Sequence, residues 1–320
     1  MTPTQATAVL ATRPAAGFIE TPFVRSLTDR ALSYLAAGYP VHFRGPAGCG
    51  KTKLAMHVAH QIGRPTMLLC GDDEFGTSDL VGGQTGYRRR KVIDNFVHSV
   101  LKTEEDVAQR WVDNRLTMAC REGLTLVYDE FTRSRPEANN VLLSVLEEKL
   151  LVLPDNRSGS SYLRVHPDFT AIFTSNPEDY AGVHKTQDAL RDRMVTIDLD
   201  YFDRQTEVAI THSRSGVPTE DAERIVDLVR ACREAGLYAF GPTIRSCIMI
   251  AKVLAIGGIP ALSGDSFFQQ TCLDVLAAEL DRPGKLAKRG PRRRDVVLDL
   301  ISKHCSAETG SGLFSLPRRA

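Results

Sequence analysis

The sequence predicts an α/β fold, in which a five-stranded, mostly parallel sheet with hairpin insertions precedes a small all-α domain. Three observations predict this fold. Five short apolar or β-branched runs alternate with amphipathic helical stretches up to Tyr201, which is the pattern of a parallel sheet covered on both faces. After Tyr201 the strand patterns stop and only helical patterns continue. Hydrophobic residues make up 42% and charged residues 25% of the 320 residues, a composition typical of globular domains.

The individual elements follow from the same patterns. The expected strands are Val41–Phe43, Thr66–Leu69, Leu124–Tyr128, Thr170–Thr174 and Val195–Leu199. The expected helices of the second domain are Asp203–Ser213, Thr219–Ala235, Thr243–Ile256, Phe267–Leu280 and Arg294–His304. The chain therefore divides into a flexible arm at 1–17, an α/β core at 18–201, and a helical domain at 202–320 that contains a basic linker at 282–294.

Two segments of the core are expected to form hairpins. Leu150–Leu153 and Tyr162–Val165 flank a stretch rich in turn-forming residues, just before the fourth strand. Val81–Val100 carries glycines and lies between the second and third strands. Its basic run at 88–91 is more typical of a solvated face than of a binding site.

Charge and cysteine content exclude several classes of protein. The 40 basic and 39 acidic residues give a net charge of +1, so no overall field attracts nucleic acid or an acidic membrane. The seven cysteines lack CxxC spacing, which argues against a zinc site or a disulfide framework. There is neither a signal-peptide pattern nor an 18-residue apolar run, so we expect a cytoplasmic protein without a transmembrane segment.

A phosphate-binding motif follows the first strand. Residues 45–52 read GPAGCGKT and fit G-x-x-x-x-G-K-[ST] between a strand and a helix, which is the context that the motif requires. The glycines let backbone N–H groups face phosphates, and the helix start adds its positive dipole. We expect ATP and Mg²⁺ as cofactors, with Lys51 on the β- and γ-phosphates and the Thr52 hydroxyl on the metal ion. The predicted nucleotide-binding residues are Gly45, Pro46, Ala47, Gly48, Cys49, Gly50, Lys51, Thr52 and Lys53.

Polar residues end two later strands. Asp129 and Glu130 follow an apolar run, at the strand end where open α/β sheets bind ligands. We expect Asp129 to hold the Mg²⁺ shell and Glu130 to polarise the attacking water. Asn176 ends the next strand, and Pro177 prevents a helix from continuing there, so Asn176 is expected to orient that water.

This order of motifs resembles the AAA+ ATPases, specifically the branch that contains MoxR-type chaperones. Leu124–Glu148 is similar to that branch's Walker B strand and following helix, and Asn176 then stands at the sensor-1 position. The resemblance implies that 18–201 is the ATPase core and that 202–320 is its helical lid.

The same resemblance places the arginines. Ala189–Met194 resembles the segment that ends in an arginine finger, with Arg193 the best match and Arg191 the alternative. Arg133 is a further candidate for an intersubunit arginine, and Arg245 stands at the sensor-2 position of the lid. An arginine near the γ-phosphate is commonly worth about 10³–10⁵ in rate. The predicted catalytic residues are Lys51, Glu130, Asn176, Arg193 and Arg245, and the predicted metal ligands are Thr52 and Asp129.

Within this branch, the segments 39–59, 88–100 and 173–193 resemble those of a gas vesicle family. The resemblance implies a remodelling or assembly ATPase that forms a homo-oligomeric, hexameric ring and acts on a protein client, either the gas vesicle shell or an accessory protein. A MoxR-like chaperone for another protein client is the alternative.

Two other classes of function stay open. A nucleic-acid motor is supported only by the basic runs at 88–91 and 282–294, and it is not expected, because those runs lack a series of interleaved aromatic residues and the net charge is near zero. A module that uses ATP only as a structural switch would turn over slowly, whereas Glu130 and Asn176 argue for hydrolysis.

Overall fold

The computed structural model describes residues 9–10, 17–94, 102–153, 161–177, 182–184, 188–236, 238, 241–277 and 293–306. Contacts divide the chain into two compact units. The α/β unit comprises Met1–Phe18, Ser26–Pro46 and Gly50–Asp200, and the helical unit comprises Ile19–Arg25, Ala47–Cys49 and Tyr201–Ala320. Most of the predicted arm at 1–17 and most of the predicted basic linker at 282–294 lie outside the described residues.

The sheet of the α/β unit contains five parallel strands and one short antiparallel strand, in the order β1-β3-β6-β9-β2-β10. The strands are β1 (Val9–Leu10), β2 (Val41–Arg44), β3 (Thr66–Cys70), β6 (Thr125–Asp129), β9 (Thr170–Ser175) and β10 (Val195–Asp198). The predicted five-stranded parallel sheet is confirmed. The additional strand β1 pairs with the open edge of β3, whose backbone groups would otherwise lack ladder partners.

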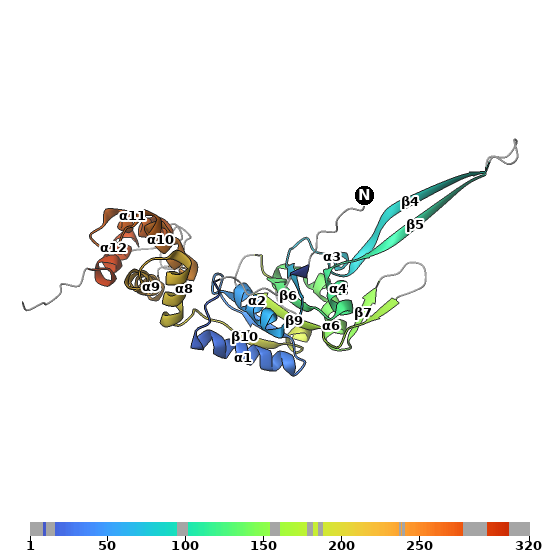
Figure 1. The fold of residues 1–320 in the computed structure, drawn as a ribbon, viewed down its shortest axis with the longest axis horizontal. Coiled ribbons are helices and arrows are strands. Elements are labelled where there is room, and N and C mark those ends of the chain that lie inside the picture. Colours follow the sequence, from blue (N-terminus) through green and yellow to red (C-terminus); the bar gives the residue numbers. More distant parts are fainter. Residues whose placement is uncertain are drawn as a thin grey trace, which may run out of the picture. The chain divides into compact units, whose positions relative to one another are not determined.

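Helices accompany both faces of this sheet (Figure 1). They are α1 (Pro22–Ala36), α2 (Lys51–Ile62), α3 (Thr77–Val81), α4 (Arg115–Glu122), α5 (Pro136–Asn139), α6 (Val141–Leu146) and α7 (Asp188–Arg191), together with the 3₁₀ turn η1 (Phe131–Arg133). α2 packs against β6 and β9, whereas α4 packs against β3 and β6.

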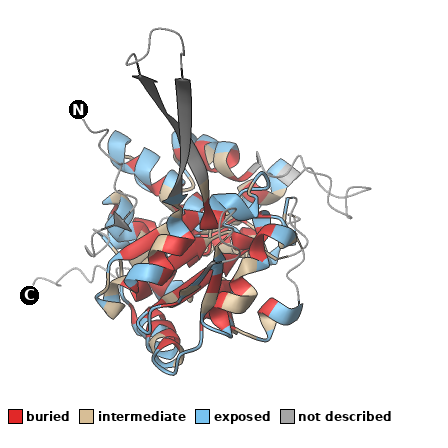
Figure 2. Ribbon diagram, turned by 90° about the vertical axis from the view of Figure 1, so that its right-hand side faces the viewer, coloured by how far each residue is buried: buried red, intermediate tan, exposed pale blue. Residues whose placement is uncertain are grey.

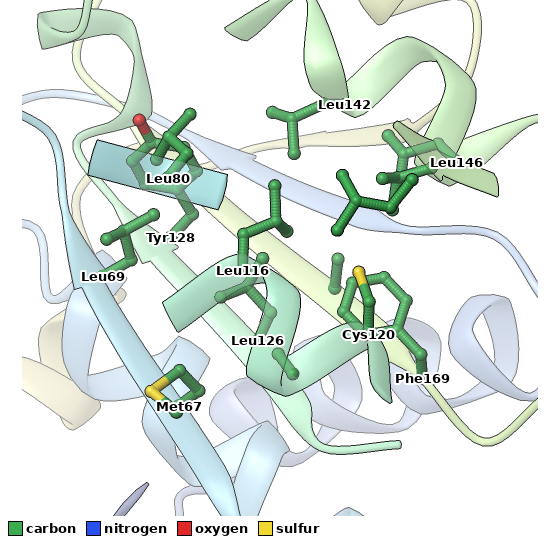
Figure 3. Packing of buried hydrophobic residues seen from close by; sticks show 14 of the residues in the cluster. Met67, Leu69, Leu80, Leu116, Cys120, Leu126, Tyr128, Leu142, Leu146 and Phe169 are labelled. Carbon is green, nitrogen blue, oxygen red and sulfur yellow. The ribbon is translucent and has the colours of Figure 1, made fainter. Parts of the chain in front are cut away.

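One apolar core fills the space between the sheet and the helices α4 and α6 (Figure 3). Every second residue of a strand points to the same face, and Leu126 and Tyr128 of β6 both belong to this core, whereas the equally buried Val127 between them does not. The central strands are therefore buried on both faces, as Figure 2 shows by their red colour. This burial explains why they read as continuous apolar runs in the sequence.

Both predicted hairpins are present. β7 (Leu150–Leu153) pairs antiparallel with β8 (Ser161–Arg164). β4 (Gly82–Asp94) pairs with β5 (Lys102–Asp113), and this longer ribbon extends away from α3 and α4 in Figure 1. The second hairpin runs past the predicted end at Val100, because its returning strand is mostly polar and lacks the alternation that marks a half-buried strand.

The helical unit contains α8 (Arg204–Ser215), α9 (Thr219–Glu234), α10 (Ile244–Gly257), α11 (Ser266–Ala277) and α12 (Arg293–His304). A single apolar core joins them, with Phe268 as its largest fully buried side chain. The carboxylate of Glu207, only 1% exposed, accepts hydrogen bonds from Arg230 at 3.0 Å and Arg233 at 2.9 Å. Two cations compensate the cost of removing this charge from water, so α8 and α9 are held in one register.

Candidate nucleotide site

Three parallel strands bring the predicted site residues to one edge of the sheet. β2 lies between β9 and β10, and its last residue, Arg44, is opposite Ser175 of β9. β6 pairs with β9 on the other side and ends at Asp129. The loops after β2, β6 and β9 therefore begin next to one another at the carboxyl edge, where open α/β sheets bind ligands.

The Lys51 ammonium group is only slightly exposed and donates to at least three acceptors among the described residues. Its Nζ donates to the carbonyl oxygens of Gly45 at 2.8 Å and Pro46 at 2.7 Å, and to Oδ1 of Asn176 at 2.9 Å. An ammonium group carries three protons and can only donate. The Asn176 oxygen must therefore face Lys51, and none of the described residues accepts a hydrogen bond from the two N–H donors of the same amide.

The second link joins Thr52 to Asp129. The Thr52 hydroxyl lies 2.7 Å from Oδ1 and 2.9 Å from Oδ2 of the carboxylate. Because an ionised carboxylate only accepts, the hydroxyl donates its proton to Asp129 and keeps its lone pairs. These hard oxygen donors fit the preference of Mg²⁺, which commonly takes few protein ligands and completes its shell with water and phosphate.

A threonine that the sequence analysis did not single out connects the two acidic residues. Thr174 of β9 is fully buried, and its Oγ1 lies 2.5 Å from Oδ1 of Asp129. The backbone N–H of Glu130 donates to the same hydroxyl oxygen at 2.9 Å. The only sequence signal was a hydroxyl residue directly after the apolar run Ala171–Phe173, two positions before Asn176.

Glu130 adopts the left-handed backbone conformation, with φ of 51°. This region is uncommon for a residue with a side chain and costs of the order of 1–3 kcal/mol. Its carbonyl oxygen accepts the N–H of Arg133 at 2.9 Å, which closes the turn η1. The Arg133 guanidinium also donates to Oε2 of Glu130 at 2.9 Å, and this hydrogen bond raises the pKa of Arg133. Non-glycine residues in such conformations cluster at functional sites.

A buried network holds the chain that follows Glu130. The Tyr128 hydroxyl donates at 2.8 Å to Ser134 Oγ and lies 3.2 Å from Asn139 Oδ1, while the Asn139 amide donates to the Phe131 carbonyl at 3.1 Å. Burial raises the pKa of Tyr128 to about 12, so the phenol stays protonated. These hydrogen bonds anchor the loop after β6 to the apolar core.

His42 of β2 lies beside Ser175 in the next strand. It is 3% exposed, and its ring nitrogens lie 2.8 Å from Ser175 Oγ and 3.1 Å from Thr196 Oγ1. Burial lowers the pKa of His42 to about 4, and the positive charge of Arg44 adds to this effect. A neutral imidazole therefore joins β9, β2 and β10 just before the site.

The remaining predicted residues have varied surroundings. Gly48 and Gly50 have φ of 82° and 86°, which only glycine adopts readily, while Cys49 is buried and Ala47 and Lys53 are exposed. The motif therefore has the tight turns that a phosphate loop needs.

The arginines lie in both units. Arg193 donates from Nε to Glu147 Oε2 at 2.7 Å and from Nη1 to the Ala189 carbonyl at 2.6 Å within the same chain. Arg191 lies 3.9 Å from Asp188. Arg245 is exposed in the first turn of α10, in the helical unit. Their predicted roles toward a nucleotide stay predictions.

Known proteins resemble this chain over most of its length. Residues 40–194 match the family model of the AAA domain (dynein-related subfamily). A gas vesicle ATPase GvpN of Ancylobacter aquaticus is 54% identical over 299 residues, which cover 92% of this chain and 83% of that protein. The chain belongs to the GvpN family of gas vesicle ATPases. A GvpN protein of Haloferax mediterranei is 49% identical over 82% of this chain and 75% of its own length.

Solved structures agree on the fold. A mutant RuvB of Thermotoga maritima matches with a TM-score of 0.50 and 17% identity, over 81% of this chain and 71% of that chain. The predicted AAA+ fold, the gas vesicle resemblance and the assignment as an ATPase are confirmed, and the fold implies nucleotide binding. Within the described part of the chain, no helix is long and apolar enough to cross a membrane.

Proposed function

We propose that this GvpN family member hydrolyses MgATP to drive a step in gas vesicle assembly. The arrangement of Lys51, Asn176 and the Thr52–Asp129 pair at one sheet edge supports hydrolysis. The similarity to gas vesicle ATPases over most of the chain supports the link to gas vesicles. When bound, Mg²⁺ would neutralise phosphate charge beside Thr52 and Asp129.

Each residue of the site has a distinct role in this proposal. A phosphate oxygen displaces one of the neutral acceptors of Lys51, because hydrogen bonds to an anion are stronger. Asn176 then uses its N–H donors to hold a phosphate oxygen or the attacking water. Glu130 accepts a proton from that water as general base, once its carboxylate is released from Arg133.

A second copy of the chain completes the site in this proposal. Arg193 is the proposed trans-acting arginine, which neutralises charge on the γ-phosphate bound by the neighbouring subunit. It would first have to leave Glu147. Hydrolysis would then require a ring, and we propose a hexamer in the cytoplasm, associated with gas vesicles. Arg245 of the helical lid would report nucleotide binding to that domain.

The hairpin β7–β8 is the proposed contact with a protein client. Val152 and Tyr162 lie opposite one another across its strands, and they are 39% and 65% exposed. A large exposed apolar pair on a projecting hairpin suits a protein partner better than nucleic acid. The gas vesicle shell or one of its accessory proteins is the proposed client.

The proposal can be tested in a bacterium that expresses a gas vesicle gene set lacking its own GvpN. Wild type, Lys51→Ala, Glu130→Gln and the remote control Gly264→Ala are supplied in turn, and vesicles are counted and sized by electron microscopy. We expect normal vesicles with wild type and the control, and few or small vesicles with both site variants. Purified Glu130→Gln should bind ATP but hydrolyse it slowly. Normal vesicles formed by an inactive variant would contradict the link between hydrolysis and assembly.

A further inference from the structure

The hydroxyl group of Thr174 has a fixed hydrogen-bond direction. Asp129 as a carboxylate can only accept, and the backbone N–H of Glu130 can only donate. Thr174 must therefore donate its single proton to Asp129 Oδ1 and accept from the Glu130 N–H, at 2.5 Å and 2.9 Å. The Thr174 side chain thereby connects the Asp129 carboxylate, the proposed metal ligand, with the backbone of Glu130, the proposed general base.

We propose that Thr174 is a positioning residue for ATP hydrolysis, which fixes Asp129 and Glu130 relative to each other. The inference rests on the roles proposed above for those two acidic residues. Thr174 acts through both of them and does not itself contact the nucleotide.

The first consequence concerns the orientation of Asp129. Oδ1 accepts from both Thr174 and Thr52, whereas Oδ2 accepts, among the described residues, only from Thr52, at 2.9 Å. Thr174 therefore fixes the rotation of the carboxylate and leaves more lone-pair capacity on Oδ2. That oxygen is available to Mg²⁺ or to a water molecule in its shell. Partners of this kind typically change metal affinity or activity about 10–100-fold when they are removed.

The second consequence concerns the backbone of Glu130. Its left-handed conformation is unfavourable unless the surroundings hold it. The hydrogen bond to Thr174 satisfies the Glu130 N–H at the start of the turn, where a partner from a fully buried strand residue is rigid. Without the Thr174 hydroxyl, the Glu130 N–H and the Asp129 carboxylate oxygen each lose a hydrogen-bond partner. The Glu130 backbone, from which its side chain extends, is then no longer held in place.

Valine has nearly the shape of threonine but no hydroxyl, so Thr174→Val tests the proposal directly. Thr170→Val is a matched control, because Thr170 lies at the opposite end of the same strand. Among the described residues, its hydroxyl hydrogen-bonds only to Thr125, at 3.3 Å. Thr174→Ser keeps the hydroxyl and should restore function. Thr174→Cys, which retains only a weak donor, replaces the valine variant if circular dichroism shows that Thr174→Val does not fold.

Three quantities are measured for each variant in the full chain. They are kcat and KM for ATP, the Mg²⁺ concentration that gives half-maximal rate, and the affinity for a fluorescent ATP analogue with and without Mg²⁺. We expect Thr174→Val to lower kcat about 10–100-fold, to raise the Mg²⁺ requirement, and to lose most of the gain in affinity that Mg²⁺ gives. Affinity without Mg²⁺ should stay near that of wild type, as should all properties of Thr174→Ser and Thr170→Val.

The outcomes separate this inference from the proposed function. If Glu130→Gln abolishes hydrolysis and Thr174→Val leaves both kcat and the Mg²⁺ requirement unchanged, the proposed function stands and the role of Thr174 is wrong. If Glu130→Gln is fully active, the proposed role of Glu130 is wrong, and the Mg²⁺ titration still decides whether Thr174 positions Asp129. Equal losses in Thr174→Val and Thr170→Val, or in Thr174→Val and Thr174→Ser, would also overturn the inference.

Discussion

The backbone of Gly71 lies directly against the carbonyl group of Glu130. A β-carbon on Gly71 would come within 2.1 Å of that carbonyl oxygen, a distance at which the backbone must move. The N–H of Gly71 also donates to the Asp129 carbonyl at 2.8 Å. The loop after β3 therefore supports the left-handed turn at Glu130, and only a residue without a side chain fits there.

We expect Gly71→Ala to impair hydrolysis more than nucleotide binding. The added methyl group displaces the backbone of Glu130, and a displacement of about 1 Å in a catalytic group can reduce the rate about 100-fold. Measurements of kcat and of ATP-analogue affinity check this. Gly264→Ala is the control, because no atom lies within 4 Å of a β-carbon there. Wild-type kcat in a folded Gly71→Ala variant would contradict the tight fit.

The contact between Lys51 and Asn176 allows a test of which group of Asn176 matters. Asn176→Asp keeps an oxygen toward Lys51 but removes both N–H donors. If those donors hold the water or a phosphate oxygen, kcat should fall about 10²–10³-fold, the usual effect of losing one such donor. The exposed Asn140 provides a control, Asn140→Asp. Full activity of Asn176→Asp would mean that Asn176 serves only to hold Lys51.

The proposed trans-acting arginine can be tested by mixing two inactive variants. Arg193→Ala subunits keep an intact phosphate site, and Glu130→Gln subunits keep an intact Arg193. If Arg193 acts on the neighbouring subunit, ATPase activity should appear when the two are mixed, because some interfaces then have both groups. If the mixture is no more active than the separate variants, Arg193 acts within its own subunit, or another residue plays this role. Arg191→Ala and Arg133→Ala, treated in the same way, cover the alternatives.

The sequence predicted the parallel sheet well because its strands are buried on both faces. Burial on both faces gives a strand such as β6 an uninterrupted apolar run, and the change from strand to helical patterns near Tyr201 is equally local. The phosphate loop could also be predicted, because its glycines and Lys51 must occur at fixed spacing. The ends of the strands β4 and β5 were harder to predict, because these strands have no alternation of polar and apolar residues.

Contacts between distant residues could not be predicted in the same way. Thr174 and Gly71 have ordinary identities, and each matters only because β9 and the loop after β3 lie beside the end of β6. The left-handed backbone of Glu130 is equally invisible in the sequence, because glutamate rarely adopts it. The proximity of Thr52 to Asp129 was expected from motif order, whereas the positions of the arginines relative to a nucleotide stay predictions.

Stability should depend on pH through His42. Its pKa is about 4 in the folded chain, against 6.5 for an unburied histidine, because burial and the positive charges of Arg44 and Arg191 outweigh the opposing effect of Asp198. Between these two values the unfolded chain binds a proton that the folded chain does not. The contribution of neutral His42 to the free energy of unfolding is therefore fully present above about pH 6.5. It is lost as the pH falls toward 4, by about 3 kcal/mol in total.

This pH dependence is measured by urea unfolding, followed by circular dichroism, at pH 7.5 and pH 5. We expect the wild-type midpoint to fall over this range, and the midpoint of His42→Gln to fall less. The glutamine amide can still reach Ser175, so His42→Gln retains part of the link between β2 and β9 but has no proton to gain. The variant should be less stable than wild type at pH 7.5, because one of the two ring contacts is lost. Identical shifts in both proteins would mean that other groups, such as the carboxylate of Asp198 paired with Arg44, govern acid unfolding.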